Sequence, residues 1–455
     1  MRGVPEEVDA QELDQTIARV AAIDVAKASG KVCTRVPHDT ITGRRVTKVW
    51  DVDSTTNAIV ELSDHLACQG IERVVIESTS DYWRPFFYLL EARGVDVWLV
   101  NARDVKQVPG RPKTDKLDAV WLAKLTEKGM LRPSFVPPKE IRELRDYTRL
   151  RVDLTAERSR HKQRLEKLLE DALIKLSIVA TDFLGVSGRA MIEALIAGER
   201  DPRRLAGLAR GRLRVKHAAL VQALTGRFDD HHAELARMLL DQMDALTAQI
   251  DRLTTRIDDL LAAIPTARAP EAAGDDDPDD GSAIASARLP AAGLPVLDRL
   301  DEIPGVGTGA AQAIIAEVGL DMTRFPTAAH LVSWAKLSPQ TIQSGPRTRR
   351  GKTGKGNRYL KGVLGEAAAA AAKTDTFLGE RYRRLVKRRG KLKALVAVAR
   401  SILVIVWHLL ADPTARFHDL GSDYHTTRIN RDRKALNHIR QLQALGFTVT
   451  VESAA

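Results

Sequence analysis

The sequence predicts an N-terminal α/β domain, a long helical region and a mainly helical C-terminal domain, and three observations lead to this order. Three β-rich runs lie between residues 18 and 52, and apolar helix and strand patterns alternate after them. Between residues 239 and 264, large apolar residues recur in the 4-3 alternation of a coiled coil. Near residues 337–360, a basic, glycine-rich segment lies between two helical patterns. A chain of 455 residues is long enough for several such domains.

The N-terminal pattern predicts one particular sheet. The runs ARVAAIDVAK, KVCTRVPHD and RRVTKVWDVD are joined by short Ser-Gly and Thr-Gly turns, so they should pair in antiparallel. Two strand runs, RVVIES and DVWLVN, then alternate with helical patterns over residues 56–68, 82–92 and 116–128. Such alternation calls for right-handed crossovers and parallel pairing. Three antiparallel strands followed by this alternation give the order of the ribonuclease H-like fold.

Four carboxylates occupy places where this fold would bring acidic groups together. Asp24 ends the apolar run of the first strand, and Glu77 ends the fourth. Asp115 and Asp118 open the helix after the fifth strand and share a helix face. Each one alone is explained as a polar strand end or a helix cap. Together they repel one another unless a cation neutralises them, and hard oxygen ligands select Mg²⁺, or Mn²⁺ in its place.

Residues 131–264 should form a helical, coiled-coil region, and residues 265–296 a disordered acidic linker. The apolar seam of the coiled coil consists of Leu239, Met243, Leu246, Ile250, Leu253, Ile257, Leu260 and Ile264. An antiparallel hairpin with the charged helix before it and a dimer-forming arm both explain this seam, and the sequence leaves both open. His231 and His232 lie at a helix start, where surface histidines are common, so we assign them no metal.

One hydroxyl lies directly ahead of a run of cations. Ser344 precedes Gly345 and Pro346, which forbid a helix, so the serine should lie on a turn. The cations that follow are Arg347, Arg349, Arg350, Lys352, Lys355 and Arg358. A serine that attacks phosphorus develops negative charge on the phosphate oxygens, and fixed cations stabilise that charge. A flexible loop that only docks on phosphates explains the same residues.

Upstream of this segment, the run IPGVGTGAAQAIIAEVG resembles the hairpin half of a helix-hairpin-helix motif. Gly305 and Gly307 would let backbone amides approach a DNA phosphate at the start of the next helix. A glycine-rich turn between helices is also a common structural device.

Composition points to a polyanionic partner. The formal net charge is +11 and the sequence pI is about 9.6, with the excess cations clustered, which is typical of nucleic-acid-binding proteins. The two cysteines lack metal-ligand spacing and suit a reducing cytoplasm. The polar, acidic start does not resemble a signal peptide. The apolar run at 394–410 is interrupted by Arg400 and His408 and is expected to be a buried helix, so no membrane partner is predicted.

With both halves in view, the chain resembles the DEDD transposases of the insertion-sequence 110 family, described as bridge-RNA-guided recombinases and similar to the pilin-gene invertases. The resemblance covers residues 18–130 and 297–410. The four carboxylates fall on the family's DEDD positions in AAIDVAK, VIEST and KTDKLDA, and Ser344 falls on the family serine in its QSG-basic-GN-R-L context. Three features depart from the family pattern: Lys336 replaces a glycine that is usual before the LSP turn, the acidic linker is long, and the tail has no assigned counterpart.

The resemblance implies a RuvC-like domain that binds Mg²⁺ and a second domain whose serine attacks DNA to form a covalent phosphoserine. It also implies donor and target DNA, a noncoding guide RNA that pairs with both, and a homo-oligomer, dimer or tetramer, that assembles the site between subunits. The expected domains are an N-terminal extension (1–17), the RuvC-like domain (18–130), the helical region (131–264), the linker (265–296), the serine-containing transposase domain (297–417) and a C-terminal extension (418–455).

Two other functions fit parts of the same pattern. A metal-dependent, structure-selective endonuclease similar to a junction resolvase would use activated water, with Ser344 only binding phosphate. A non-enzymatic DNA-binding protein would not need an intact carboxylate set, and this chain has one.

Overall fold

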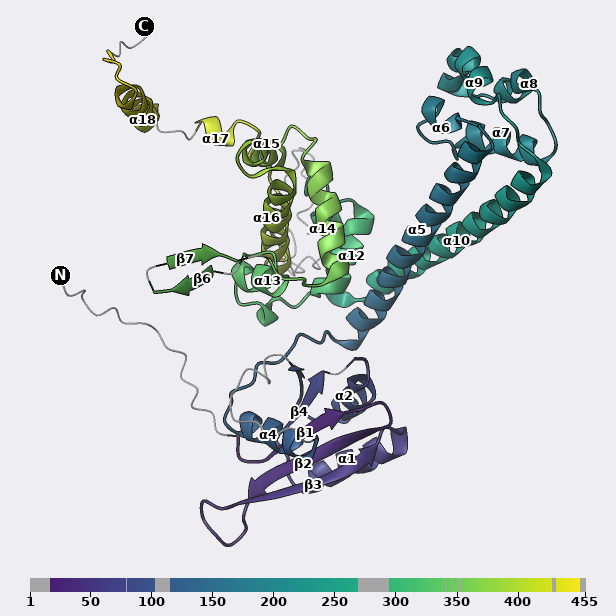
Figure 1. The fold of residues 1–455 in the computed structure, drawn as a ribbon. Coiled ribbons are helices and arrows are strands. Elements are labelled where there is room, and N and C mark those ends of the chain that lie inside the picture. Colours follow the sequence, from purple (N-terminus) through teal and green to yellow (C-terminus); the bar gives the residue numbers. More distant parts are fainter. Residues whose placement is uncertain are drawn as a thin grey trace, which may run out of the picture. The chain divides into compact units, whose positions relative to one another are not determined.

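A computed structural model describes residues 17–78, 80–102, 115–268, 294–339, 341–345, 347–351, 353–427 and 431–450 (Figure 1). The chain divides into two compact units, Met1–Val136 and Pro137–Ala455, and each is described by itself. The first is a mixed α/β unit and the second is largely helical, as the sequence predicts. Most of the acidic linker lies outside the described residues.

The N-terminal unit contains a five-stranded sheet in the order β3-β2-β1-β4-β5. The strands are β1 (Val20–Val25), β2 (Ser29–Pro37), β3 (Arg45–Asp53), β4 (Arg73–Ser78) and β5 (Val97–Asn101). The pairs β1–β2 and β2–β3 are antiparallel, whereas β1–β4 and β4–β5 are parallel. This is the strand order that the sequence predicts, and it is consistent with a ribonuclease H-like domain.

Helices cover both faces of this sheet. On one face, α1 (Thr56–Cys68) and α2 (Trp83–Ala92) pack on a core that contains Ile23 and Ile76. On the other face, α4 (Asp115–Glu127) packs on a core that contains Ala22 and Val75. The alternation of side chains along each strand explains why adjacent residues enter different cores. Cys33 lies in the α4 core, and burial raises the pKa of its thiol to about 11.

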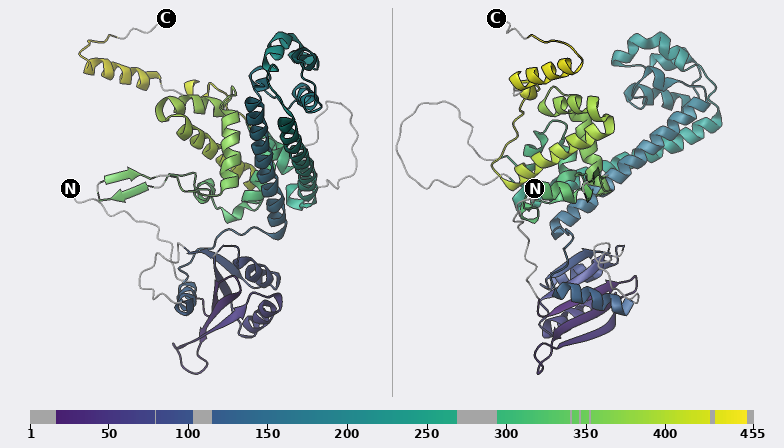
Figure 2. Two further views of the ribbon diagram at one scale, coloured as in Figure 1. Left: turned by 45° about the vertical axis from the view of Figure 1, so that its right-hand side comes forward. Right: turned by 60° about the vertical axis from the view of Figure 1, so that its left-hand side comes forward.

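The second unit begins with a long arm. Helices α5 (Lys139–Asp171) and α10 (Asp230–Ala263) run side by side as an antiparallel hairpin (Figure 2). Five residues of the predicted seam are buried: Met243, Leu246, Ile250, Ile257 and Ile264. The structure therefore shows the seam packed within one chain, the first of the two explanations that the sequence left open. The homo-oligomer remains a prediction, without support from this seam.

A small helical domain, which the sequence analysis did not predict, joins the far ends of α5 and α10. It consists of α6 (Leu176–Val179), α7 (Val186–Ile196), α8 (Pro202–Gly207), the 3₁₀ helix η1 (Gly211–Lys216) and α9 (His217–Ala223). Its core includes Phe183, Met191, Leu220 and Phe228, together with Leu165 of α5 and Leu240 of α10. We call this domain the arm tip.

The C-terminal part of the second unit surrounds one apolar helix, α16 (Lys391–Ala411). Around it pack α11 (Val296–Asp301), α13 (Ala328–Trp334), α14 (Arg358–Ala371) and α15 (Phe377–Arg389). The helix α12 (Thr308–Val318) packs on α14 and on α5, and α17 (Tyr424–Thr427) and α18 (Arg431–Ala444) follow α16. By length and composition α16 alone among the described helices could span a membrane, but Val398, Ile402 and Val406 are buried within this unit.

The packing of the seam predicts how the arm responds to charge. Replacing both Leu253 and Ile257 by Asp should unfold the arm, because Ile257 is fully buried and an unpaired charge there costs several kcal/mol. We expect a loss of helical circular dichroism and new proteolytic cuts within α10. Thr255→Asp, at an exposed position of the same helix, is the control and should leave both unchanged. A variant that stays fully helical but loses oligomeric mass would show instead that the seam holds subunits together.

Candidate active site

Two predicted carboxylates lie at the ends of neighbouring parallel strands. In the register of β1 and β4, Ile23 is paired with Ile76, so Asp24 and Glu77 are the next residue on each strand. Ala22 and Val75 enter the core under α4. Because side chains alternate along a strand, Asp24 and Glu77 project from the same face as these two residues. Glu77 is buried and Asp24 is half-buried.

The helix α4 brings a third carboxylate to the same end of the sheet. That carboxylate is Asp118, and its place follows from the direction of α4. At the C-terminal end of α4, Glu127 receives hydrogen bonds from Arg35 (2.7 Å) and Arg45 (3.0 Å). Arg35 pairs with the first residue of β1. The N-terminal end of α4 must therefore lie toward the other end of β1, where Asp24 is. Asp118 is half-buried in the first turn, four residues before the buried Leu122, and so on the sheet-facing side. Asp115 is the first residue of α4, and its side chain lies outside the described part.

A second group of possible metal ligands is explained by helix capping. Ligand atoms of Asp171, His231 and His232 lie within 4.8 Å of one another. However, Nδ1 of His232 accepts a hydrogen bond from the backbone N–H of Asp229 at 3.2 Å, which closes a capping box at the start of α10. This bond places the proton on Nε2, which faces Asp171 Oδ2 at 3.1 Å. Both ring nitrogens of His232 are thus engaged. That His231 and His232 bind no metal stays an expectation.

The basic segment forms a β-hairpin, whereas the sequence predicts only a turn at Ser344. Strands β6 (Thr341–Ser344) and β7 (Arg347–Arg350) pair so that Ser344 is opposite Arg347. Gly345 has φ +58°, a left-handed conformation that suits a two-residue turn. Ser344 is therefore the strand residue that adjoins the turn. The side chains of Ser344 and Arg350, and all of Lys352, lie outside the described part.

The described cations of this segment are open to solvent. Arg347, Arg349 and Lys355 are exposed, and no acidic side chain among the described residues pairs with them. Arg358 is also exposed, but it contacts Asp153 of α5 at 3.3 Å. Unpaired cations on an exposed hairpin can meet phosphate oxygens without first breaking an ion pair.

Behind the hairpin, two glycines and Lys336 pack closely together. A Cβ on Gly356, which has φ +60°, would lie 2.6 Å from the carbonyl oxygen of Ala335, so only glycine fits there. Lys336 itself has φ +56°, a conformation that favours glycine and costs other residues roughly 1–2 kcal/mol. This explains physically why a glycine would be usual at position 336. The stem of Lys336 lies close over Gly354 and Gly356, where a Cβ on either glycine would press against it.

Asn357 fixes the start of the helix that leaves the basic segment. Its Oδ1 accepts hydrogen bonds from the backbone N–H groups of Tyr359 (2.9 Å) and Leu360 (3.2 Å), which makes it the N-cap of α14. Its Nδ2 donates to Glu317 of α12. The glycine and asparagine of the GN pair are thus explained by close packing and by capping.

Glu317 is the centre of a buried network that the sequence analysis missed. Its side chain is 1% exposed and accepts two hydrogen bonds from Arg149 of α5, at 2.7 and 2.8 Å. Burial lowers the pKa of Arg149, but the hydrogen bond to Glu317 and the nearby charges of Glu317, Tyr359 and Asp146 together outweigh burial, so the pKa lies above its ordinary value. Arg145, also on α5, donates to the carbonyl oxygens of Ala316 and Glu317 at 2.9 Å. Glu317 therefore joins the base of the arm, α12 and the N-terminus of α14.

This network predicts a large stability effect. Glu317→Ala should destabilise the second unit by about 3–5 kcal/mol, because it leaves Arg145 and Arg149 partly buried without their carboxylate. Urea unfolding followed by circular dichroism measures the change. Glu366→Ala, at an exposed position of α14, is the matched control and should change stability by less than about 0.5 kcal/mol. If both variants unfold at the same urea concentration, the network contributes nothing.

The glycines predicted to approach DNA lie in the turn between α11 and α12. A Cβ on Gly305, which has φ +86°, would lie 2.3 Å from the carbonyl oxygen of Ala367 in α14. Packing against α14 is therefore sufficient to require glycine at 305. Gly307 is the N-cap of α12, and a Cβ there would meet open space. DNA contact at these two glycines remains a prediction.

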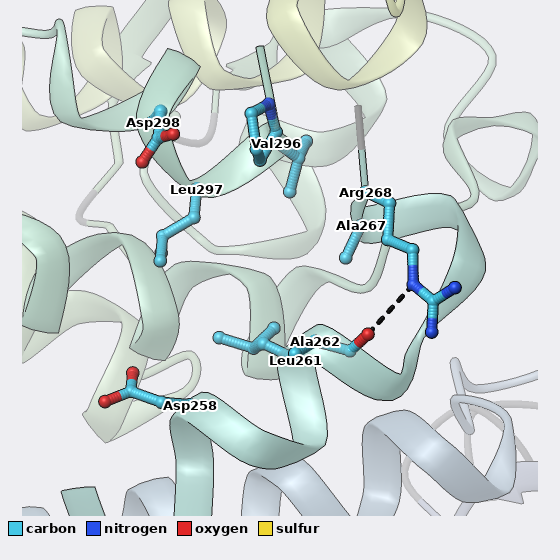
Figure 3. Close-up of a pocket in the computed structure, with 9 residues that line it drawn as sticks. Asp258, Leu261, Ala262, Ala267, Arg268, Val296, Leu297 and Asp298 are labelled. Atoms are coloured by element: carbon cyan, nitrogen blue, oxygen red, sulfur yellow. Dashed lines mark hydrogen bonds between the residues drawn. The ribbon is translucent and has the colours of Figure 1, made fainter. Parts of the chain in front are cut away.

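A cavity of about 360 Å³ lies where α10 ends and α11 begins (Figure 3). Its lining includes Asp258, Leu261, Arg268 and Asp298, and Arg268 donates to the carbonyl oxygen of Ala262 at 2.9 Å. It contains none of the predicted site residues, and Asp258 is engaged by Gln312 at 2.5 Å. We therefore assign it no part in the chemistry.

Comparisons with known proteins cover both candidate sites. A family model for IS110 DEDD proteins, described as "Transposase", matches residues 21–174, which contain the four carboxylates. A second, described as "Transposase IS116/IS110/IS902 family", matches residues 297–383, which contain Ser344. The insertion element IS110 uncharacterized 43.6 kDa protein of Streptomyces coelicolor is 37% identical over 123 residues. That stretch covers 26% of this chain and 30% of the relative's length. Both halves of the sequence thus lead to one conclusion, that the chain belongs to the IS110 family of transposases.

Proposed function

We propose that this protein is a DNA transposase or site-specific recombinase that cuts and rejoins strands through a covalent phosphoserine at Ser344. The observation that carries the proposal is the convergence of Asp24, Glu77 and Asp118 toward one end of the sheet, on the side covered by α4. The open cations around Ser344 support a nucleic-acid backbone as the substrate.

The donor set fits a hard divalent cation. Asp24, Glu77, Asp115 and Asp118 offer only carboxylate oxygens, the ligands of Mg²⁺ and Mn²⁺, with no imidazole or thiol among them. A cation bound there would neutralise charge at a phosphodiester.

In the proposed reaction, Oγ of Ser344 attacks a phosphorus atom, and the serine proton passes to a base. A serine–phosphate ester forms as the bond to the leaving sugar oxygen breaks, and that oxygen takes up a proton. A sugar hydroxyl of the second strand then attacks the ester and releases the serine, so no external energy source is consumed. Arg347 and Arg349, which follow the turn on β7, would hold the phosphate oxygens on which charge develops.

The proposal extends to partners through the family resemblance. Donor and target DNA are the substrates, a noncoding guide RNA pairs with both, and a homo-oligomer carries out the exchange.

Covalent trapping tests the proposed chemistry. Full-length protein is incubated with Mg²⁺ and labelled DNA that carries a junction of the element, and the products are separated on a denaturing gel. The proposal predicts labelled DNA that migrates with the protein and is released by protease. Cleaved DNA without any adduct would favour the endonuclease that uses water.

A further inference from the structure

The arm tip carries a concentration of charge that the proposed chemistry does not use. Residues 203–216, which we call the basic tip segment, contain six cations and no acidic residue. The cations are Arg203, Arg204, Arg210, Arg212, Arg214 and Lys216. The segment runs from α8 through η1, and all six side chains are exposed.

Most of these charges have no acidic partner. Arg204 lies 3.6 Å from Glu199, but no acidic side chain in the described part of the chain pairs with the other five. Arg214 donates to the carbonyl oxygen of Ala209 at 3.3 Å, and Lys216 to that of Val179 at 3.0 Å. Such bonds orient a cation without neutralising it. Val215, between these two residues, is 91% exposed and offers an apolar contact beside them.

Several other cations of the arm and its tip are paired with carboxylates. Lys162 contacts Asp182 at 2.8 Å, Arg189 contacts Asp244 at 2.7 Å, and Arg237 and Lys175 pair with Glu193 and Glu170. Exposed cations without an acidic partner also occur elsewhere on the described arm, for example Arg164, Lys167 and Arg227, but the basic tip segment has five of them within 14 residues.

The basic tip segment is also separate from the hairpin of Ser344. Through Glu317, Arg149 of α5 is connected to Asn357, which follows the hairpin. About 30 Å of helix lies between Arg149 and the tip.

We propose that the basic tip segment binds the phosphate backbone of nucleic acid, as a second contact remote from the reacting phosphate. Closely spaced, exposed and unpaired guanidinium groups match the regular negative charge of a phosphodiester chain. The inference rests on the proposed function only in taking nucleic acid to be the substrate. The chemistry is the same for duplex DNA and for structured RNA, and the experiment separates them.

The test compares two triple variants of the full-length protein. The tip variant carries Arg210→Gln, Arg212→Gln and Arg214→Gln, and the control carries Lys162→Gln, Lys175→Gln and Arg237→Gln. Both lose three positive charges, but only the first removes unpaired ones. Fluorescence anisotropy measures the affinity of each for a duplex DNA and for a hairpin RNA, without Mg²⁺, over a range of salt concentrations.

The tip variant should bind at least one of the two nucleic acids about tenfold more weakly near 0.1 M salt. In a plot of log affinity against log salt concentration, the slope should be smaller in magnitude by about 2–3 for the tip variant. Each phosphate contact with duplex DNA contributes about 0.9 to the magnitude of this slope. Weaker binding of DNA alone, of RNA alone or of both supports the proposal and identifies the ligand. Equal losses for both triple variants, or no change in slope for the tip variant, would overturn it.

A single substitution keeps the test valid if the triple tip variant does not fold. Arg212→Gln removes an exposed side chain of η1 and should reduce the slope by about 0.9 with an unchanged thermal transition. An unchanged slope in a folded Arg212→Gln protein counts against the proposal. Because binding is measured without cleavage, its outcome is independent of whether Ser344 forms an adduct.

Discussion

Ser344→Ala should abolish the covalent adduct and reduce recombination by at least about 1,000-fold, because alanine has no oxygen to attack phosphorus. DNA binding should stay within about twofold of the original protein, since Arg347, Arg349 and Lys355 remain exposed and unpaired in the described part of the chain. Trapping gels measure the adduct and anisotropy measures the binding. Ser344→Cys offers a thiolate in place of the hydroxyl and should retain slight activity.

Ser338→Ala is the matched control for this experiment. Ser338 is a half-buried serine that precedes the hairpin, so it offers a hydroxyl close in sequence to the basic segment without adjoining the turn. Its replacement should leave both adduct and recombination intact. Full recombination by Ser344→Ala would contradict the assignment of the nucleophile, and loss of the adduct in Ser338→Ala would shift it to that residue.

Asp24→Asn should reduce strand cleavage by at least about 100-fold while leaving the fold intact. The change removes one ligand charge from a hard-cation site, but it preserves the shape of a half-buried side chain on β1. Asp118→Asn should act in the same way from α4. Calorimetric titration with Mn²⁺ gives a readout that does not depend on cleavage, and the affinity should fall in both variants.

The control for the carboxylates is Asp53→Asn, on the exposed end of strand β3. It should bind Mn²⁺ and cleave DNA as the original protein does. Cleavage that persists unchanged in EDTA would contradict the proposed metal site. Unchanged Mn²⁺ affinity in Asp24→Asn would exclude this residue as a ligand.

The N-terminal fold was predictable because its signals are local. Period-two apolar runs specify an antiparallel meander, and the alternation that follows permits few connections. The prediction of a turn at Ser29 and Gly30 was wrong, because both residues are paired in β2 and the turn comes before them. The spacing of Asp115 and Asp118 is enough by itself to predict a shared helix face. Strand order then places Asp24 beside Glu77, since β1 and β4 are neighbours.

The features that escaped prediction depend on contacts distant in sequence. The seam of α10 is equally satisfied by α5 of the same chain or by another subunit, so its pattern cannot choose between them. The arm tip consists of short helices whose periodicity is too brief to detect. Asn357 could have been found as an N-cap, but its bond to Glu317, and that of Glu317 to Arg149, join residues far apart in the chain.

The central claim is that Ser344 carries DNA during the reaction. Its most direct test is to digest the trapped protein–DNA adduct with protease and nuclease and to identify the modified peptide by mass spectrometry. The account predicts a nucleotide remnant on the peptide that contains Ser344, joined to the serine oxygen. A remnant on Ser338 or Tyr359, or cleaved DNA with no modified peptide, would contradict it.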